Sequence, residues 1–178
     1  AVTQASNTLG TRPDLRPVIE AAHAVGAVVV VDGCQGVVHG GVNVREMDCD
    51  FYAFSGHKLY GPTGIGVLYG KRELLERMPP FLGGGDMVDT VTFEETTYAP
   101  VPLKFEAGTA NFVGAIGLGE AVKFVQRFDP AEIEAHEESL LRRATERLSA
   151  IDGLRIYGTA PGKCAIVSFN VEGVHPYD

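Results

Sequence analysis

The stretch Ala27-Val28-Val29-Val30-Val31-Asp32 decides the fold of this chain. Its apolar residues follow one another without the alternation of apolar and polar side chains that marks a half-exposed strand. An unbroken run rich in β-branched residues is typical of a strand buried on both faces of a parallel sheet. We therefore expect an α/β fold with a mainly parallel sheet, in which Asp32 ends a strand.

The neighbouring segments agree with this fold. Residues 1–5 resemble a further strand, and residues 13–25 carry apolar side chains at helical spacing, with Gly26 suited to end the helix. Two more apolar segments, 49–54 and 65–69, are predicted strands with only about ten residues between them. Because a parallel crossover usually needs a dozen or more residues, we expect this pair to be antiparallel or not adjacent.

The pattern changes in the second half of the chain. We predict a short helix over 71–78 and a loose, glycine-rich region over 83–104, where glycine and proline interrupt any regular element. A helix is expected over 111–127. Asp129 and Pro130 are suited to begin a second, amphipathic helix that runs to about residue 150.

Two strands, 154–157 and 164–170, follow that helix in the sequence. The change of pattern near residue 130 predicts two domains. The first is a large domain over residues 1–129, incomplete at its N-terminus, and the second is the start of a small α+β domain over residues 130–178, which we expect to be truncated. Because the chain begins with Ala1 in a predicted strand, we interpret it as a fragment.

The composition excludes several classes of protein. The chain has 178 residues, 45% of them hydrophobic, and a net charge of −8, which disfavours sequence-independent nucleic-acid binding because that requires an excess of Lys and Arg. No apolar run approaches the roughly 20 residues of a membrane span. The three cysteines, Cys34, Cys49 and Cys164, have neither the spacing of a metal site nor the density of a disulfide scaffold, so we expect no metal and a cytoplasmic location.

Polar residues follow two of the predicted strands and mark the candidate site. Asp32 ends the valine-rich strand, and Ser55-Gly56-His57-Lys58 follows the strand 49–54. In an open α/β sheet, ligands bind at the carboxyl ends of the strands. Taken alone, Asp32 could be an ordinary cap or loop residue, and Lys58 could be a solvated surface charge.

Together, these two residues suit pyridoxal phosphate. The cofactor needs a lysine amine to bond its aldehyde and a carboxylate to keep its pyridine nitrogen protonated. Burial favours the neutral amine of a lysine, which is the form that attacks a carbonyl. Lys58 and Asp32 would meet both needs at one edge of the sheet.

Three motifs resemble a known family. Val31-Asp32-Gly33-Cys34-Gln35, the segment Phe54–Gly66 that contains Ser55-Gly56-His57-Lys58, and Phe105-Glu106-Ala107-Gly108-Thr109 are similar to signatures of the group II cysteine desulfurases, the SufS-like branch of the class V aminotransferase family. The resemblance extends over essentially the whole chain, in one order and one spacing. It implies the large-domain fold of the fold type I PLP-dependent transferases.

The resemblance also implies roles for individual residues. Lys58 would hold the cofactor covalently and then move protons, while Asp32 would pair with the pyridine nitrogen. Gln35 would donate to the ring hydroxylate, and Ser55 and His57 would bind the phosphate. His57 could instead be a loop histidine whose hydrogen bonds are already satisfied.

Two further residues complete the implied cofactor site. Asn7 would lie beside the ring oxygen and the substrate carboxylate, and Thr109 would reach the phosphate of the partner subunit, so that the resemblance implies a homodimer. Either residue could instead serve its own turn, Asn7 as a turn-former and Thr109 through its hydroxyl.

The implied activity is removal of sulfur from L-cysteine, which yields L-alanine and an enzyme persulfide for an acceptor protein of iron–sulfur cluster assembly. L-selenocysteine could be processed by the same residues. The alternatives are another class V reaction, such as transamination or kynurenine cleavage, and a fragment that only binds cofactor. We expect this chain alone to be inactive.

The chain departs from the family pattern in a few places. Gln4 stands where family members usually have a histidine, and Cys34 where they often have alanine. The family's nucleophilic cysteine loop and the arginine that binds the substrate carboxylate have no match within the chain. Cys164 opens an apolar strand, and we interpret it as a core residue.

Overall fold

The structure, a computed structural model, describes residues 1–177 and forms one four-stranded sheet, two two-stranded sheets and their helices. The strands are β1 Val2–Thr3, β2 Val30–Asp32, β3 Phe51–Ser55, β4 Gly66–Gly70, β5 Val88–Val91, β6 Thr96–Tyr98, β7 Leu154–Tyr157 and β8 Ser168–Val171. The α-helices are α1 Arg16–Ala24, α2 Val44–Met47, α3 Arg72–Arg77, α4 Phe112–Val125 and α5 Pro130–Ser149, and two 3₁₀ helices are η1 Gly56–Leu59 and η2 Leu103–Phe105.

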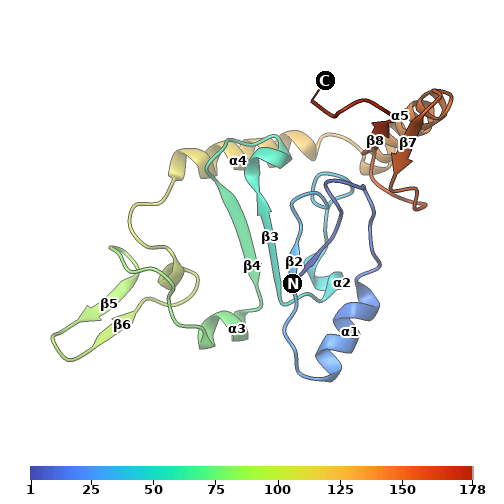
Figure 1. Cartoon of the computed structure of the whole chain (residues 1–178). Coiled ribbons are helices and arrows are strands. Elements are labelled where there is room, and N and C mark those ends of the chain that lie inside the picture. Colours follow the sequence, from blue (N-terminus) through green and yellow to red (C-terminus); the bar gives the residue numbers. More distant parts are fainter. Residues whose placement is uncertain (178) are drawn as a thin grey trace.

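The four-stranded sheet has the order β1-β2-β3-β4, and Figure 1 shows it at the centre of the molecule. β1, β2 and β3 are parallel, and β4 runs antiparallel to β3. The mainly parallel sheet is therefore confirmed, and so is the prediction that strands joined by so short a connection would not be parallel neighbours. The register places Asp32 beside Ala53, so β2 and β3 finish at the same edge.

Local sequence explains where the main helices begin and end. α1 begins at Arg16, later than predicted, with Pro17 in its first turn. Gly26 follows the helix with a φ of +72°, a left-handed conformation that glycine adopts at low cost. α5 begins as predicted, because the Asp129 carboxylate accepts a hydrogen bond from the Ala131 N–H.

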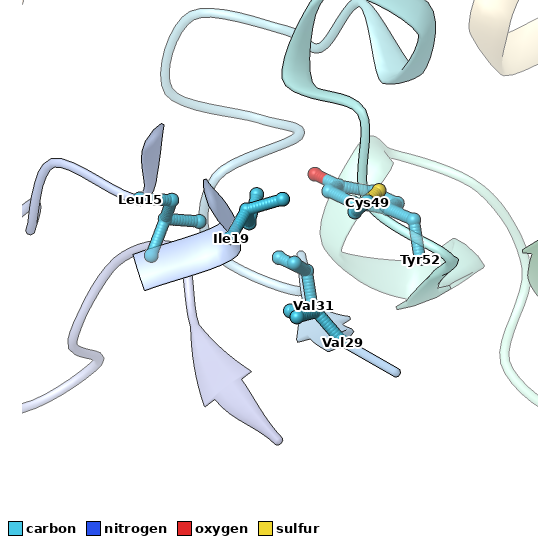
Figure 2. Packing of buried hydrophobic residues seen from close by; sticks show 6 residues of the cluster. All are labelled: Leu15, Ile19, Val29, Val31, Cys49 and Tyr52. Atoms are coloured by element: carbon cyan, nitrogen blue, oxygen red, sulfur yellow. The ribbon is translucent and has the colours of Figure 1, made fainter. Parts of the chain in front are cut away.

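The core lies between α1 and the sheet. Figure 2 shows its central side chains, which come from α1, from β2 with the residue before it, and from β3 with the segment before it. They are Leu15, Ile19, Val29, Val31, Cys49 and Tyr52. Val31 is fully buried and Tyr52 is 1% exposed, so the centre of the sheet is well packed on this face.

Three expectations about the elements were wrong. The run 27–31 is not a strand buried on both faces: β2 begins only at Val30, and Val28 and Val30 are 50% and 38% exposed because α1 covers only the face of Val29 and Val31. The region 83–104 contains the β5–β6 hairpin. The predicted strand 164–170 begins only at Ser168, because the Cys164 N–H donates instead to the Gly10 carbonyl.

None of the helices within residues 1–177 combines the length and apolar character needed to cross a bilayer.

Candidate functional site

The turn after β2 fixes the Asp32 carboxylate. Asp32 Oδ1 accepts a hydrogen bond of 2.9 Å from the Cys34 N–H, and the Gly33 N–H donates to the Ala53 carbonyl of β3. The hydrogen bonds from Cys34 hold the pKa of Asp32 below its ordinary value, and the charge of Lys58 lowers this pKa further. Asp32 is therefore an ionised carboxylate at neutral pH.

Lys58 lies in η1, the 3₁₀ turn that follows β3 directly. Its side chain is half-buried, and its neighbour Leu59 is buried and anchors the turn. Because β2 and β3 are parallel, their ends bring Asp32 and Lys58 to one edge of the sheet, close enough for the lysine charge to affect the carboxylate. The prediction that the two residues share this edge is confirmed.

Helix α4 holds the loop that carries Lys58. It crosses the end of the sheet at which β3 finishes and packs against η1 (Figure 1). The buried side chain of Leu118 approaches so closely that a Cβ added to Gly61 would lie 2.9 Å from Leu118 Cδ1. Asn111 Nδ2 donates to the Gly64 carbonyl at 3.1 Å. The sequence did not predict these contacts, because α4 is separated from η1 by more than fifty residues of chain.

Other predicted site residues lie around this pair. Ser55 ends β3, and its hydroxyl is 4.0 Å from the sulfur of Cys34, which lies in the turn after Asp32. Gln35 is half-buried in the same turn, and His57 is exposed on η1. Within residues 1–177, no group of three or more His, Cys, Asp or Glu side chains could hold a metal ion.

Asn7 and Thr109 lie further from the pair. Asn7 is exposed in the turn after β1, which ends at the same edge as β2, and its Oδ1 accepts a hydrogen bond from the Thr8 hydroxyl at 3.4 Å. Thr109 is exposed in a segment that pairs with the glycine turn, where the Gly108 N–H donates to the Gly85 carbonyl. The fold does not bring Thr109 into the cluster of its own chain.

The arrangement combines an ionised carboxylate, a primary amine and a hydroxyl at the end of a parallel sheet. Such a set can bind a group that carries a cation, an electrophilic carbonyl and an anion. The sequence profile of the aminotransferase class-V family matches residues 1–178, and the chain belongs to this family.

Curated relatives to which the chain is similar include cysteine desulfurases. The chain is 52% identical over 174 residues to a cysteine desulfurase of Synechococcus elongatus, covering 98% of the chain and 28% of that protein. It is 51% identical to a probable cysteine desulfurase of Vibrio cholerae, covering all of the chain and 44% of that protein. The chain thus spans less than half the length of these curated relatives.

A solved structure agrees with this placement. The crystal structure of the cysteine desulfurase CsdA from Escherichia coli matches 99% of the chain and 44% of its own length, with 47% identity and a TM-score of 0.93. The chain has the α/β fold of the fold type I PLP-dependent transferases, as the motifs predicted.

Proposed function

We propose that the full-length protein is a PLP-dependent cysteine desulfurase that converts L-cysteine to L-alanine and keeps the sulfur as a persulfide. One observation carries the proposal: Lys58 and the ionised Asp32 reach the same sheet edge from two parallel strands, and the lysine charge acts on the carboxylate. The likeness to cysteine desulfurases supports the choice of substrate.

The residues at this edge fit pyridoxal phosphate. The cofactor presents an aldehyde, a protonated pyridine nitrogen and a phosphate, which call for an amine, an anion and hydrogen-bond donors. Lys58 supplies the amine, Asp32 has a lowered pKa and supplies the anion, and Ser55 and His57 supply donors beside η1. The half-buried Gln35, in the same turn as Asp32, would donate to the ring hydroxylate.

When bound, the cofactor's ring withdraws electrons from the α carbon of the substrate. Asp32 holds a proton on the ring nitrogen, because the ionised carboxylate stabilises the positive charge there. The Nζ of Lys58 would accept the proton that leaves the α carbon of the substrate. Asn7 orients the substrate carboxylate at the end of β1. The thiolate that accepts the sulfur would come from a residue outside this chain.

The proposal extends to a homodimer. The β5–β6 hairpin extends away from the four-stranded sheet (Figure 1), and its apolar side chains are exposed, Val91 to 65% and Tyr98 to 43%. An exposed apolar hairpin is a suitable interface with a second copy. A partner subunit would also give Thr109 its role, since the residue is exposed and outside its own chain's cluster.

The remaining parts of the proposal concern organisation and location. We propose a large domain over 1–129 and the start of a small domain at 130, because α5 packs on β7, and β7 and β8 form a sheet of their own. The cysteines Cys34, Cys49 and Cys164 are all free, which supports a reducing cytoplasm. The persulfide sulfur would pass to an acceptor protein of iron–sulfur cluster assembly.

The test uses the full-length protein loaded with pyridoxal phosphate and supplied with L-cysteine and a thiol reductant. We expect alanine and sulfide in equal amounts, no product from Lys58→Ala, and unchanged turnover in the control Lys123→Ala, which alters an exposed lysine of α4. A parallel reaction with L-selenocysteine measures substrate preference. Formation of pyruvate in place of alanine, or turnover without Lys58, would contradict the proposal.

A further inference from the structure

A half-buried hydrogen bond lies beneath the turn that carries Asp32. Tyr52, the second residue of β3, is 1% exposed, and Figure 2 shows its ring among the core side chains. Its hydroxyl donates to Gln4 Oε1 at 2.6 Å and lies 3.4 Å from the Gly33 carbonyl. The bond therefore joins β3 to the residue after β1 directly below the turn that follows β2.

The turn is built closely around these two side chains. A Cβ added to Gly33 would lie 1.9 Å from the Tyr52 ring, and one added to Gly36 would lie 1.9 Å from Gln4 Oε1. A side chain at position 33 would overlap the tyrosine ring, and one at position 36 would have to displace the Gln4 side chain and so break its bond to Tyr52. The backbone from Gly33 to Gly36 thus rests on the Tyr52–Gln4 pair.

The same turn is tied to both neighbouring strands. The Gln4 N–H donates to the Asp32 carbonyl, and the Gly33 N–H donates to the Ala53 carbonyl, each at 2.9 Å. The Asp32 carboxylate, in turn, takes its hydrogen bond from the Cys34 N–H of this turn. Any tilt of the turn would therefore move the N–H that orients the carboxylate.

Tyr52 remains a hydrogen-bond donor across the physiological range. Burial raises the pKa of its hydroxyl, and the nearby Cys49, Cys34 and Asp32 act in the same direction. A buried hydroxyl with a single short partner is costly to leave unpaired. The Tyr52–Gln4 hydrogen bond therefore persists whether or not the Asp32 carboxylate is ionised.

We propose that Gln4 and Tyr52 are positioning residues, whose hydrogen bond sets the orientation of the Asp32 carboxylate toward the cofactor's ring nitrogen. The inference rests on the proposed function. Tyr52 is 1% exposed, so the pair would act through the turn, and the resemblance implies a histidine at the position of Gln4. An imidazole nitrogen can also accept the tyrosine hydroxyl, so both side chains could serve the same purpose.

The experiment compares variants of the full-length protein loaded with pyridoxal phosphate. Tyr52→Phe removes the donor and Gln4→Leu removes the acceptor. Tyr69→Phe is the matched control, because Tyr69 is the register partner of Tyr52 on β4, one strand further from the turn after β2. Gln4→His tests rescue. The readouts are the cofactor dissociation constant, the pH midpoint of the cofactor's absorption band and the thermal midpoint.

We expect Tyr52→Phe and Gln4→Leu to weaken cofactor binding about tenfold, since each removes the hydrogen bond on which the turn rests. The pH midpoint of the cofactor's absorption band should rise by roughly half a unit. A displaced Asp32 carboxylate would hold the proton on the ring nitrogen less well, and the nitrogen bonded to Lys58 would then be more basic. Tyr69→Phe should match the wild type, and Gln4→His should restore both readouts.

Each outcome decides one question. If the wild type forms a cofactor band that Lys58→Ala abolishes, the cofactor site of the proposed function stands, and the positioning role is then judged separately. A lowered thermal midpoint with an unchanged pH midpoint in Tyr52→Phe and Gln4→Leu would overturn the positioning role and leave a structural one. If the wild type forms no such band, the proposed function fails instead.

Discussion

Asp32 acts through its charge, which the turn after β2 secures. Hydrogen bonds from Cys34 and the charge of Lys58 both favour the ionised form. Asp32→Asn keeps nearly the same shape but is neutral, so it cannot hold a proton on the ring nitrogen. We expect the variant to retain covalently bound cofactor and to lose turnover on the order of 100-fold or more.

The measurement is alanine release by the full-length variant at saturating cofactor. A loss of binding without a loss of turnover per bound cofactor would contradict the role given to Asp32, since it would assign the residue to affinity alone. Asp152→Asn, in the exposed turn after α5, is the matched control and should behave as the wild type.

At the scale of residues, the sequence predicted the pair but not its support. Asp32 and Lys58 follow two apolar runs, and parallel strands end at a common edge, so their proximity followed from chain order. The Tyr52–Gln4 bond depends on which residue of one strand faces which residue of another. That register comes from packing around Gly33 and Gly36, and a single sequence does not encode it in any spacing.

At the scale of elements, α4 is the support for the Lys58 loop. Leu118 is 6% exposed and lies against Gly56 and Gly61. We expect Leu118→Ala to cost about 2–4 kcal/mol in free energy of unfolding, from lost burial and the cavity left behind. Cofactor affinity should fall as well, because the loop gains freedom.

Urea unfolding of the full-length protein measures this cost. The control Leu140→Ala removes a side chain that is 49% exposed on α5 and should change the unfolding free energy by less than about 0.5 kcal/mol. Equal effects of the two substitutions would contradict the view that α4 supports the loop.

A second polar network ties the opposite end of the strands together. Asp50, 6% exposed, accepts hydrogen bonds from the Val29 N–H at 2.7 Å and from His23 Nε2 at 2.9 Å, and Lys71 Nζ lies 3.1 Å from it. Burial raises the pKa of Asp50, but these three partners outweigh burial and hold the pKa below its ordinary value. The carboxylate therefore joins α1 to the residue before β2 and to the residue after β4.

The sign of its pH dependence follows from this lowered pKa. A carboxyl group whose pKa is depressed by folding stabilises the protein above its unfolded pKa, which is about 3.9, and loses that contribution as the pH falls through its folded pKa. We expect Asp50→Ala to cost about 1–3 kcal/mol at pH 7, with the difference from wild type shrinking below about pH 4. Urea titrations across this range measure the difference, and a gap that stays constant would contradict the network's role.

Element prediction succeeded where a local pattern was sufficient and failed where packing decided. The cap at Asp129 followed from a short stretch of sequence, and the short connection between β3 and β4 excluded a parallel pair of neighbours. The prediction for residues 27–31 was wrong because a continuous apolar run was interpreted as a strand buried on both faces. In the structure α1 covers only the face of Val29 and Val31. The β5–β6 hairpin was missed because its strands are short, and because the glycine run before β5 and the prolines after β6 indicated irregular structure.

At the scale of the whole molecule, the hairpin makes the dimer testable. Phe93 at its tip is fully exposed, at 107% of the reference area. In an isolated chain this apolar ring contributes no burial to stability. If the hairpin contacts a second copy, Phe93→Asp should raise the dimer dissociation constant at least about tenfold. Glu94→Gln is the control on the same tip. Sedimentation equilibrium measures the constant, and a wild type that is monomeric at micromolar concentration would contradict the proposal.

The most direct test of the central claim is to locate the covalent attachment of the cofactor. The full-length protein is loaded with pyridoxal phosphate, reduced with borohydride, digested and analysed by peptide mass. We predict one modified peptide, which contains Lys58, and no modification of Lys71, whose amine is paired with Asp48 and Asp50. A reduced adduct that persists on another lysine in Lys58→Ala would contradict the claim that this residue and Asp32 hold the cofactor between them.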